Sequence, residues 1–337
     1  GLLFGVGGAT LFSIKLGEGK SEEADRALGN AFSLMVIAGA LFMITGQILL
    51  RPLLTLFGAS EAVLPYSMEY MRVIFFGAIF QVIGMGMNNF IRADGSPQTA
   101  MLTMFLGAGI NTLLDPLFIY VFRMGMTGAA LATILAQCIS ATWVVMYFIG
   151  KHSKHKLMRK YMKLKLNVVL TITSLGIPGF ALQLANSLLN AILNKSLLIY
   201  GGDIAVSGMG IINSLQTIFY MPVIGIKQGV QPIISFNYGA RKFDRVKEAV
   251  KLAVISATVI VVFGYVITRL FPRQIISIFN RDPELMEFGS YGMTAWFLCM
   301  PAVGFQIIAS QFFQAIGKSK AAMFLTLTRQ VIFLIPA

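Results

Sequence analysis

The chain is poor in charged residues, cysteine and histidine, and each shortage excludes a class of protein. Only 12% of its 337 residues are charged, whereas a soluble domain typically carries about 25%, so a water-covered surface is excluded. Cys138 and Cys299 both lie in apolar stretches, which excludes a disulfide framework and a cysteine-based metal site. His152 and His155 stand in a basic segment, where we expect a solvated loop rather than catalysis.

Motifs for nucleotide binding and hydrolysis are missing as well. The glycines of Gly5–Gly8 follow no predicted strand and have the wrong spacing for a dinucleotide fingerprint. The sequence contains no Walker motif and no nucleophile–base constellation. We therefore expect neither an ATP-driven pump nor an enzyme, and no cofactor.

Long hydrophobic runs dominate what is present. Hydrophobic residues make up 56% of the chain, and the mean hydropathy is +0.76. Runs such as 31–50 and 252–270 match a bilayer core of about 30 Å at about 1.5 Å per helical residue. Because a helix satisfies its backbone polar groups within lipid, we predict an all-α membrane protein with about ten spans. These spans are placed at 1–14 (partial), 28–50, 67–90, 98–122, 127–149, 168–200, 205–236, 248–271, 288–314 and 321–337 (partial).

The net charge of +13 is concentrated in alternate connections between these spans. The basic connections are cytoplasmic by the positive-inside rule, which explains the charge without a nucleic-acid partner. The longest, 151–165, predicts a contact with anionic lipid that anchors the topology. We expect a multi-pass protein of the plasma membrane, the inner membrane of a bacterium. The basic connections are 15–26, 92–98, 151–165, 241–251 and 318–320.

The two halves of the sequence repeat each other, and equivalent positions differ by a constant offset in residue number. This offset places Ser13 on Ser235 and Gly95 on Gly317 without a gap. Equivalent loops fall on the same side, which predicts a parallel repeat of two pseudo-symmetric six-helix bundles. Both chain ends lie inside apolar stretches, so we expect an intact relative to have twelve helices, with the first and the last missing here. The predicted parts are an N-terminal bundle at 1–150, a basic cytoplasmic linker at 151–167 and a C-terminal bundle at 168–337.

Polar residues inside a membrane span are costly and so indicate function. Asn111 and Asp115 are four residues apart and share a helix face, and Pro116 frees a carbonyl in the turn before it. Thr133 lies at the depth of Asp115, because both are equally far from the hairpin between their helices. These oxygens suit Na⁺, or a proton on Asp115. Alternatively, Asp115 and Pro116 only kink the helix.

A second set of polar residues belongs to the C-terminal half. Asn186, Asn190 and Asn194 form one stripe at helical spacing, and helix–helix contact explains it as well as substrate binding does. Lys227 lies too deep for easy snorkelling, so it either pairs with a carboxylate or lines a cavity. The candidate substrate cavity comprises Gln183, Asn186, Asn190, Asn194 and Lys227.

Three segments together resemble the multidrug and toxic compound extrusion (MATE) family along the whole chain. They are Asn111…Asp115-Pro116, the turn Arg92-Ala-Asp-Gly-Ser-Pro97, and the loop Gln228-Gly-Val-Gln-Pro232…Asn237-Tyr-Gly-Ala240. The resemblance implies two six-helix lobes around a V-shaped cavity, with alternating access driven by Na⁺ or H⁺. It also implies that Asn111, Asp115 and Thr133 bind the cation. Relatives add an aspartate on the first helix, which this chain does not contain, and no acid stands at the C-lobe positions 183–190 and 302–306.

We therefore predict a secondary active multidrug efflux transporter. It would act as a monomer and exchange Na⁺ or H⁺ for amphipathic small molecules, often organic cations. A lipid-linked sugar flippase of the same superfamily is the main alternative, although only Lys227 is clearly available for a pyrophosphate. An intramembrane enzyme would need a cluster of acids, histidines or cysteines, and a scaffold without transport would tolerate Asp115→Asn.

Overall fold

The computed structural model describes residues 1–56, 61, 63–151, 153–280 and 282–328. Over these residues the chain is helical and forms no strand. Among the described residues, seven helical segments are long and apolar enough to cross a membrane, and one bent pair of helices meets the same criteria when taken together. The predicted all-α membrane fold is therefore confirmed.

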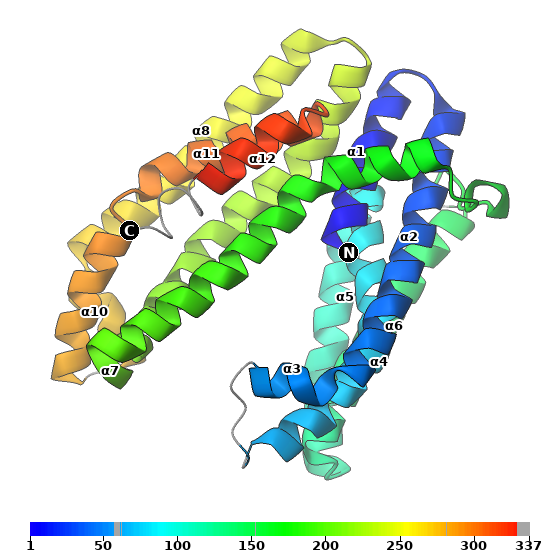
Figure 1. The fold of residues 1–337 in the computed structure, drawn as a ribbon. Coiled ribbons are helices and arrows are strands. Elements are labelled where there is room, and N and C mark those ends of the chain that lie inside the picture. Colours follow the sequence, from blue (N-terminus) through cyan, green and yellow to red (C-terminus); the bar gives the residue numbers. More distant parts are fainter. Residues whose placement is uncertain (57–60, 62, 152, 281, 329–337) are drawn as a thin grey trace. The chain divides into compact units, whose positions relative to one another are not determined.

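Figure 1 shows the helices in sequence order, from blue at the N-terminus to red. The first half contains α1 (Leu2–Gly17), α2 (Ser21–Ile48), α3 (Leu50–Leu56), α4 (Leu64–Ala93), α5 (Pro97–Pro116), the π-helical η1 (Leu117–Val121), α6 (Gly125–Ile149) and the 3₁₀ turn η2 (Arg159–Tyr161). The second half contains α7 (Leu166–Gly239), α8 (Phe243–Leu270), α9 (Pro272–Phe279), α10 (Pro283–Trp296), α11 (Met300–Ala315) and α12 (Ser319–Leu327).

The chain divides into two compact units, Gly1–Gly176 and Ile177–Ala337. The boundary lies inside α7, so the first unit includes the basic linker and the first turns of α7. α7 itself consists of two helices that meet at Gly202, whose φ of 61° is accessible mainly to glycine. Its two parts, Leu166–Leu197 and Ile204–Gly239, are each long enough to span a membrane.

The helix boundaries repeat at the offset found in the sequence, the one that places Ser13 on Ser235. α2 runs from Ser21 to Ile48 and α8 from Phe243 to Leu270, so this offset superposes both ends of the two helices. It also superposes the first residues of α3 and α9, and those of α5 and α12. The two halves are therefore built on the same helical plan.

The turns that precede α2 and α8 are equivalent down to their hydrogen bonds. The N–H of Lys20 donates to the carbonyl of Lys15, and the N–H of Lys242 donates to the carbonyl of Asn237, both at 2.9 Å. Each turn passes through a left-handed residue, and in the second copy this residue is Arg241, with φ 58°. A side chain at that φ costs free energy, so the helix ends around it must hold this turn in place.

Three details differ from the sequence prediction. α2 begins at Ser21 rather than at residue 28, because acidic residues at the start of a helix interact favourably with its dipole and extend it beyond the apolar run. The short helices α3 and α9 were not predicted. The predicted span 288–314 is broken by a 47° bend between α10 and α11, where Pro301 in the first turn of α11 has no N–H to continue the hydrogen-bond ladder.

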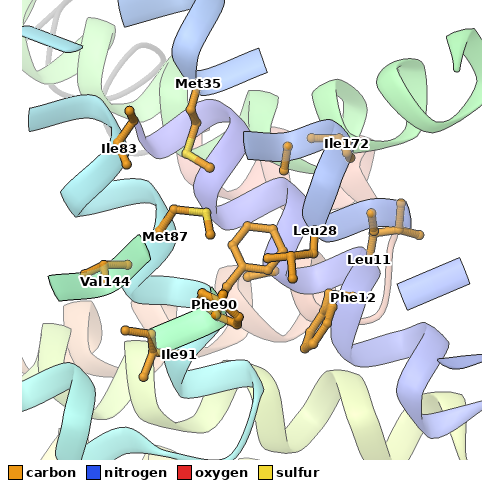
Figure 2. Packing of buried hydrophobic residues seen from close by; sticks show 14 of the residues in the cluster. Leu11, Phe12, Leu28, Met35, Ile83, Met87, Phe90, Ile91, Val144 and Ile172 are labelled. Atoms are coloured by element: carbon orange, nitrogen blue, oxygen red, sulfur yellow. The ribbon is translucent and has the colours of Figure 1, made fainter. Parts of the chain in front are cut away.

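The core of the first unit lies where α1, α2, α4 and α6 meet the start of α7. Figure 2 shows its side chains packed around Phe12 and Phe90, whose rings meet edge to face at 5.7 Å. Glycine allows the backbones of α1 and α7 to approach, since a Cβ on Gly176 would lie 1.8 Å from the carbonyl oxygen of Leu3. Close packing of this kind is what stabilises helix contacts in lipid.

The second unit has a core of its own, built from α7, α8, α9, α10 and α11. Its fully buried side chains include Val223, Ile234, Val261, Ile276 and Met293. Each unit therefore has an independent apolar interior, as the repeat predicts.

Candidate functional site

The candidate cation site lies where α5 loses its regular hydrogen bonding. α5 ends at Pro116, and the next five residues form the π-helix η1. Pro116 has no N–H to donate to the carbonyl of Thr112. Isolated π-helical turns are frequent at functional sites, and here the turn begins two residues after Asp115.

The structure brings together the three residues predicted to bind the cation. The amide nitrogen of Asn111 donates to Oδ1 of Asp115 at 3.2 Å and to Oγ1 of Thr133 at 3.4 Å. The Thr133 hydroxyl in turn donates to the carbonyl of Ala129 at 3.0 Å. All three side chains are half-buried between α5 and α6. Their proximity follows from the equal depths expected in the sequence, whereas their role in binding a cation stays a prediction.

The chemistry of this group is that of one negative charge with neutral oxygen donors around it. Asp115 supplies the carboxylate, Thr133 a hydroxyl and Asn111 an amide. Among the described residues no group of three or more histidines, cysteines or acids could hold a metal ion. One carboxylate balances one monovalent ion, so the arrangement fits Na⁺ or a proton better than a divalent metal.

The polar residues predicted for a substrate cavity belong to the second unit and lie on the first part of α7. Gln183 and Asn190 are exposed on the surface of that unit, and Asn186 is half-buried. The side chain of Asn194 lies outside the described residues. An exposed amide on a membrane-spanning helix needs water or a polar partner. We therefore expect this face of α7 to contact water or polar groups and not lipid tails alone.

Lys227 lies on the second part of α7 and is half-buried. Among the ion pairs of the described residues, none includes Lys227. The alternative that it pairs with a carboxylate therefore finds no support in that part of the chain, and its role in a cavity stays a prediction.

The solvated loop expected for the linker histidines is wrong for His155. His152 lies outside the described residues, but His155 is half-buried rather than solvated, with Nδ1 at 2.8 Å from Oδ1 of Asp25. Its ring meets Phe12 edge to face at 5.2 Å. The sequence does contain one indication that the linker is held in place. Asn30 is an amide one turn inside the apolar part of α2 and is buried, and a buried amide needs hydrogen-bond partners.

Comparison with known families and proteins points to one group. The sequence model of the MatE family matches residues 1–117 and 178–337. The multidrug export protein MepA of Staphylococcus haemolyticus (strain JCSC1435) is 24% identical over 334 residues, which cover 99% of this chain and 74% of the relative. MepA of Staphylococcus aureus (strain MSSA476) is 25% identical over 336 residues, with the same coverage.

Solved structures agree with this. The MATE multidrug transporter DinF-BH superposes with a TM-score of 0.92 at 35% sequence identity, over 99% of this chain and 75% of that one. A multidrug resistance MATE family transporter in an outward-facing conformation superposes with a TM-score of 0.91 at 24% identity, over 98% and 74% of the two chains. The second likeness concerns the fold alone.

Proposed function

The chain belongs to the MatE family, and we propose that it drives export by exchanging Na⁺ or H⁺ for its substrate through alternating access. Membership makes it a multidrug efflux transporter of the plasma membrane and not an enzyme. The proposal concerns how transport is coupled and which side chains carry the coupling.

One observation supports the coupling proposal, namely the hydrogen-bonded group of Asn111, Asp115 and Thr133. In the observed arrangement the Asn111 amide nitrogen faces both neighbouring oxygens. Rotating this amide by half a turn would replace the donor with the carbonyl oxygen. A carboxylate, a hydroxyl and an amide oxygen would then converge on one point, which suits Na⁺. With H⁺ as the ion, the same amide oxygen would accept a hydrogen bond from protonated Asp115.

The position of this group next to η1 offers a way to pass ion binding on to the helix. Neutralising Asp115 changes which hydrogen bonds its side chain accepts, and the adjoining turn already lacks the N–H of Pro116. A turn that has lost a regular bond can change its bend at lower cost. In this proposal, loading of the ion shifts the bend of α5 and thereby favours one of two access states.

The free energy that one coupled ion supplies is comparable to the free energy that export of one substrate molecule costs. A membrane potential supplies about 2.3 kcal/mol per charge per 100 mV. A 100-fold concentration gradient of substrate costs about 2.8 kcal/mol at about 1.4 kcal/mol per tenfold step. For a neutral substrate, one ion that moves down its own gradient as well as the potential can therefore sustain such export. One-for-one exchange with a monovalent organic cation moves no net charge, so the concentration gradient of the ion alone must then drive export.

We propose that the substrates are amphipathic small molecules, often organic cations. Two relatives are named multidrug export proteins. The chain carries 19 methionines and 27 phenylalanines, and methionine repacks readily around varied ligands. The exposed amides Gln183 and Asn190 would supply polar contacts. A flippase would need several cationic residues for a pyrophosphate, and among the predicted spans of the sequence only Lys227 is a clear candidate.

The test is efflux of a fluorescent cationic dye from proteoliposomes under an imposed Na⁺ or pH gradient. We expect Asp115→Asn to lower the gradient-driven rate at least tenfold, because the variant lacks the carboxylate that binds the exchanged cation. The matched control is Asp244→Asn, since the Asp244 side chain is fully exposed at the start of α8, and it should export normally. Unchanged efflux in Asp115→Asn would remove that carboxylate from the mechanism, and no dye export by the unaltered chain would favour a flippase.

A further inference from the structure

The linker between the two bundles is held on α2 by a buried amide. Asn30 is fully buried, and its nitrogen donates to the carbonyls of Tyr161 at 2.9 Å and Lys163 at 3.2 Å. Its oxygen accepts the N–H of Lys165 at 2.8 Å. One side chain of α2 therefore binds three backbone groups of the linker, and Ser33 adds a fourth bond one turn further along.

Two further contacts fix the path of the linker. Gly29 leaves room for it, since a Cβ at this position would lie 2.6 Å from the carbonyl carbon of Tyr161. Asp25 pairs with His155 near the other end of the linker. The linker therefore follows the first turns of α2 and does not hang free as a tether.

The sequence of α2 gives the depth of this contact. Arg26 is the last charged residue of α2, and 27–48 carries no charge. Asn30 lies four residues beyond Arg26, about 6 Å further in at about 1.5 Å per residue. The linker backbone bound to Asn30 therefore lies near the boundary between headgroups and hydrocarbon.

The side of α2 that the linker covers continues as an apolar stripe. Asn30, Ser33, Ile37, Leu41 and Ile44 recur at helical spacing and share one face. The three apolar members are exposed on the surface of the unit. Exposed apolar side chains on a spanning helix are those that acyl chains cover, because lipid tails are as apolar as leucine.

The second unit shows the same face without a linker. At the offset of the repeat, Asn30 corresponds to Leu252 and Ser33 to Ile255 on α8, and both of these apolar side chains are exposed. The exposed stripe continues there through Val259 and Phe263. The linker thus covers the cytoplasmic end of a face that in the repeated helix is apolar throughout.

The outer surface of the linker alternates basic and apolar side chains. Arg159, Lys160 and Lys163 are exposed, and so are the apolar side chains of Met158 and Leu164. Apolar side chains among lysines and arginines are typical of segments that lie in the interface of an anionic membrane.

We propose that the linker is a binding surface for anionic phospholipids of the cytoplasmic leaflet. Arg159, Lys160 and Lys163 bind headgroup phosphates, while Met158 and Leu164 lie at the level of the upper acyl chains. Since the linker connects the two bundles, lipid bound there stabilises the first unit at the point where the chain leaves it.

The test compares two triple variants of the whole chain in detergent, titrated with phosphatidylglycerol or with phosphatidylcholine and followed by thermal unfolding. Each basic side chain near an anionic surface contributes about fivefold in affinity, so neutralising three should weaken the apparent affinity for phosphatidylglycerol about 100-fold. The matched control removes the same charge from exposed residues before and within α8. The linker variant is R159Q/K160Q/K163Q and the control is K242Q/R245Q/K247Q.

The control should keep its affinity for phosphatidylglycerol within about threefold of the unaltered chain. A charge-preserving variant, R159K/K160R/K163R, separates loss of charge from damage to the fold and should bind as the unaltered chain does. The proposal is overturned if phosphatidylglycerol stabilises no better than phosphatidylcholine, or if both neutralising variants lose affinity equally. Inorganic phosphate at the same concentration should have no effect, and stabilisation by it would indicate a soluble anion in place of a lipid.

Discussion

Replacing Asn30 by leucine tests whether the linker is bound to α2 as a separate, local unit. Leucine has nearly the shape of asparagine, and it is the residue at the equivalent position of α8. The change removes the partners of three linker groups, at Tyr161, Lys163 and Lys165. At about 1 kcal/mol for each hydrogen bond, docking of the linker should weaken by about 3 kcal/mol. This corresponds to about a 100-fold rise in the undocked population.

Trypsin measures that population, because the linker contains several lysines and arginines and cleavage needs an undocked backbone. When docking is fast relative to cleavage, the cleavage rate follows the population of the open form. We therefore expect Asn30→Leu to be cut within 151–165 about 100 times faster than the unaltered chain in detergent. Hydrogen exchange of the same segment should rise in parallel, while exchange in α4 should not.

The matched control is Asn167→Leu, since Asn167 is exposed in the first turn of α7 beside the linker. It should leave the cleavage rate unchanged. The reasoning is refuted if Asn30→Leu is cut no faster than this control. It is equally refuted if the variant loses global thermal stability and α4 exchanges as readily as the linker, because Asn30 would then support the whole bundle.

Two further changes test the close packing and the charged turn. Gly176→Ala places a Cβ against a carbonyl of α1 and should cost about 1–3 kcal/mol of unfolding free energy, whereas Gly210→Ala, which meets open space, should be near neutral in thermal unfolding. Burial alone would raise the pKa of the Glu18 carboxyl, but hydrogen bonds from two neighbouring lysines outweigh it and leave the pKa below 4.5. The two lysines therefore stabilise the folded chain through the Glu18 carboxylate above pH 4.5, and this stabilisation is lost as the pH falls through the lower folded pKa. The difference in unfolding free energy between the unaltered chain and Glu18→Gln should therefore vanish in acid.

The spans and the grouping of the candidate cation-site residues could be predicted from the sequence, because both depend on the spacing of residues close together in the chain. Hydropathy locates each apolar run, and counting residues from the hairpin brings Asp115 and Thr133 to one depth. The docked linker was not predictable in this way, since Asn30 and Tyr161 are 131 residues apart and nothing local connects them. The bend between α10 and α11 depends on Pro301, but a proline alone does not tell whether a span kinks or continues.

Comparison of the two copies separates the residues that build a bundle from those that serve another purpose. The turns before α2 and α8 share their hydrogen bonds, so these features belong to the fold. The polar side chains of the candidate cation site do not repeat: in the sequence, Asn111 corresponds to Phe333 and Asp115 to Ala337.

The same holds for the residues that dock the linker, because Asp25 corresponds to Lys247 and Asn30 to Leu252. The second copy forms the same helix between the same ends without these side chains. Buried polar groups cost free energy unless they are paired, so groups that the helical plan does not require need another reason to be present. For Asn111 and Asp115 the proposed reason is exchange of a cation, and for Asn30 it is a linker held at the depth of the lipid headgroups.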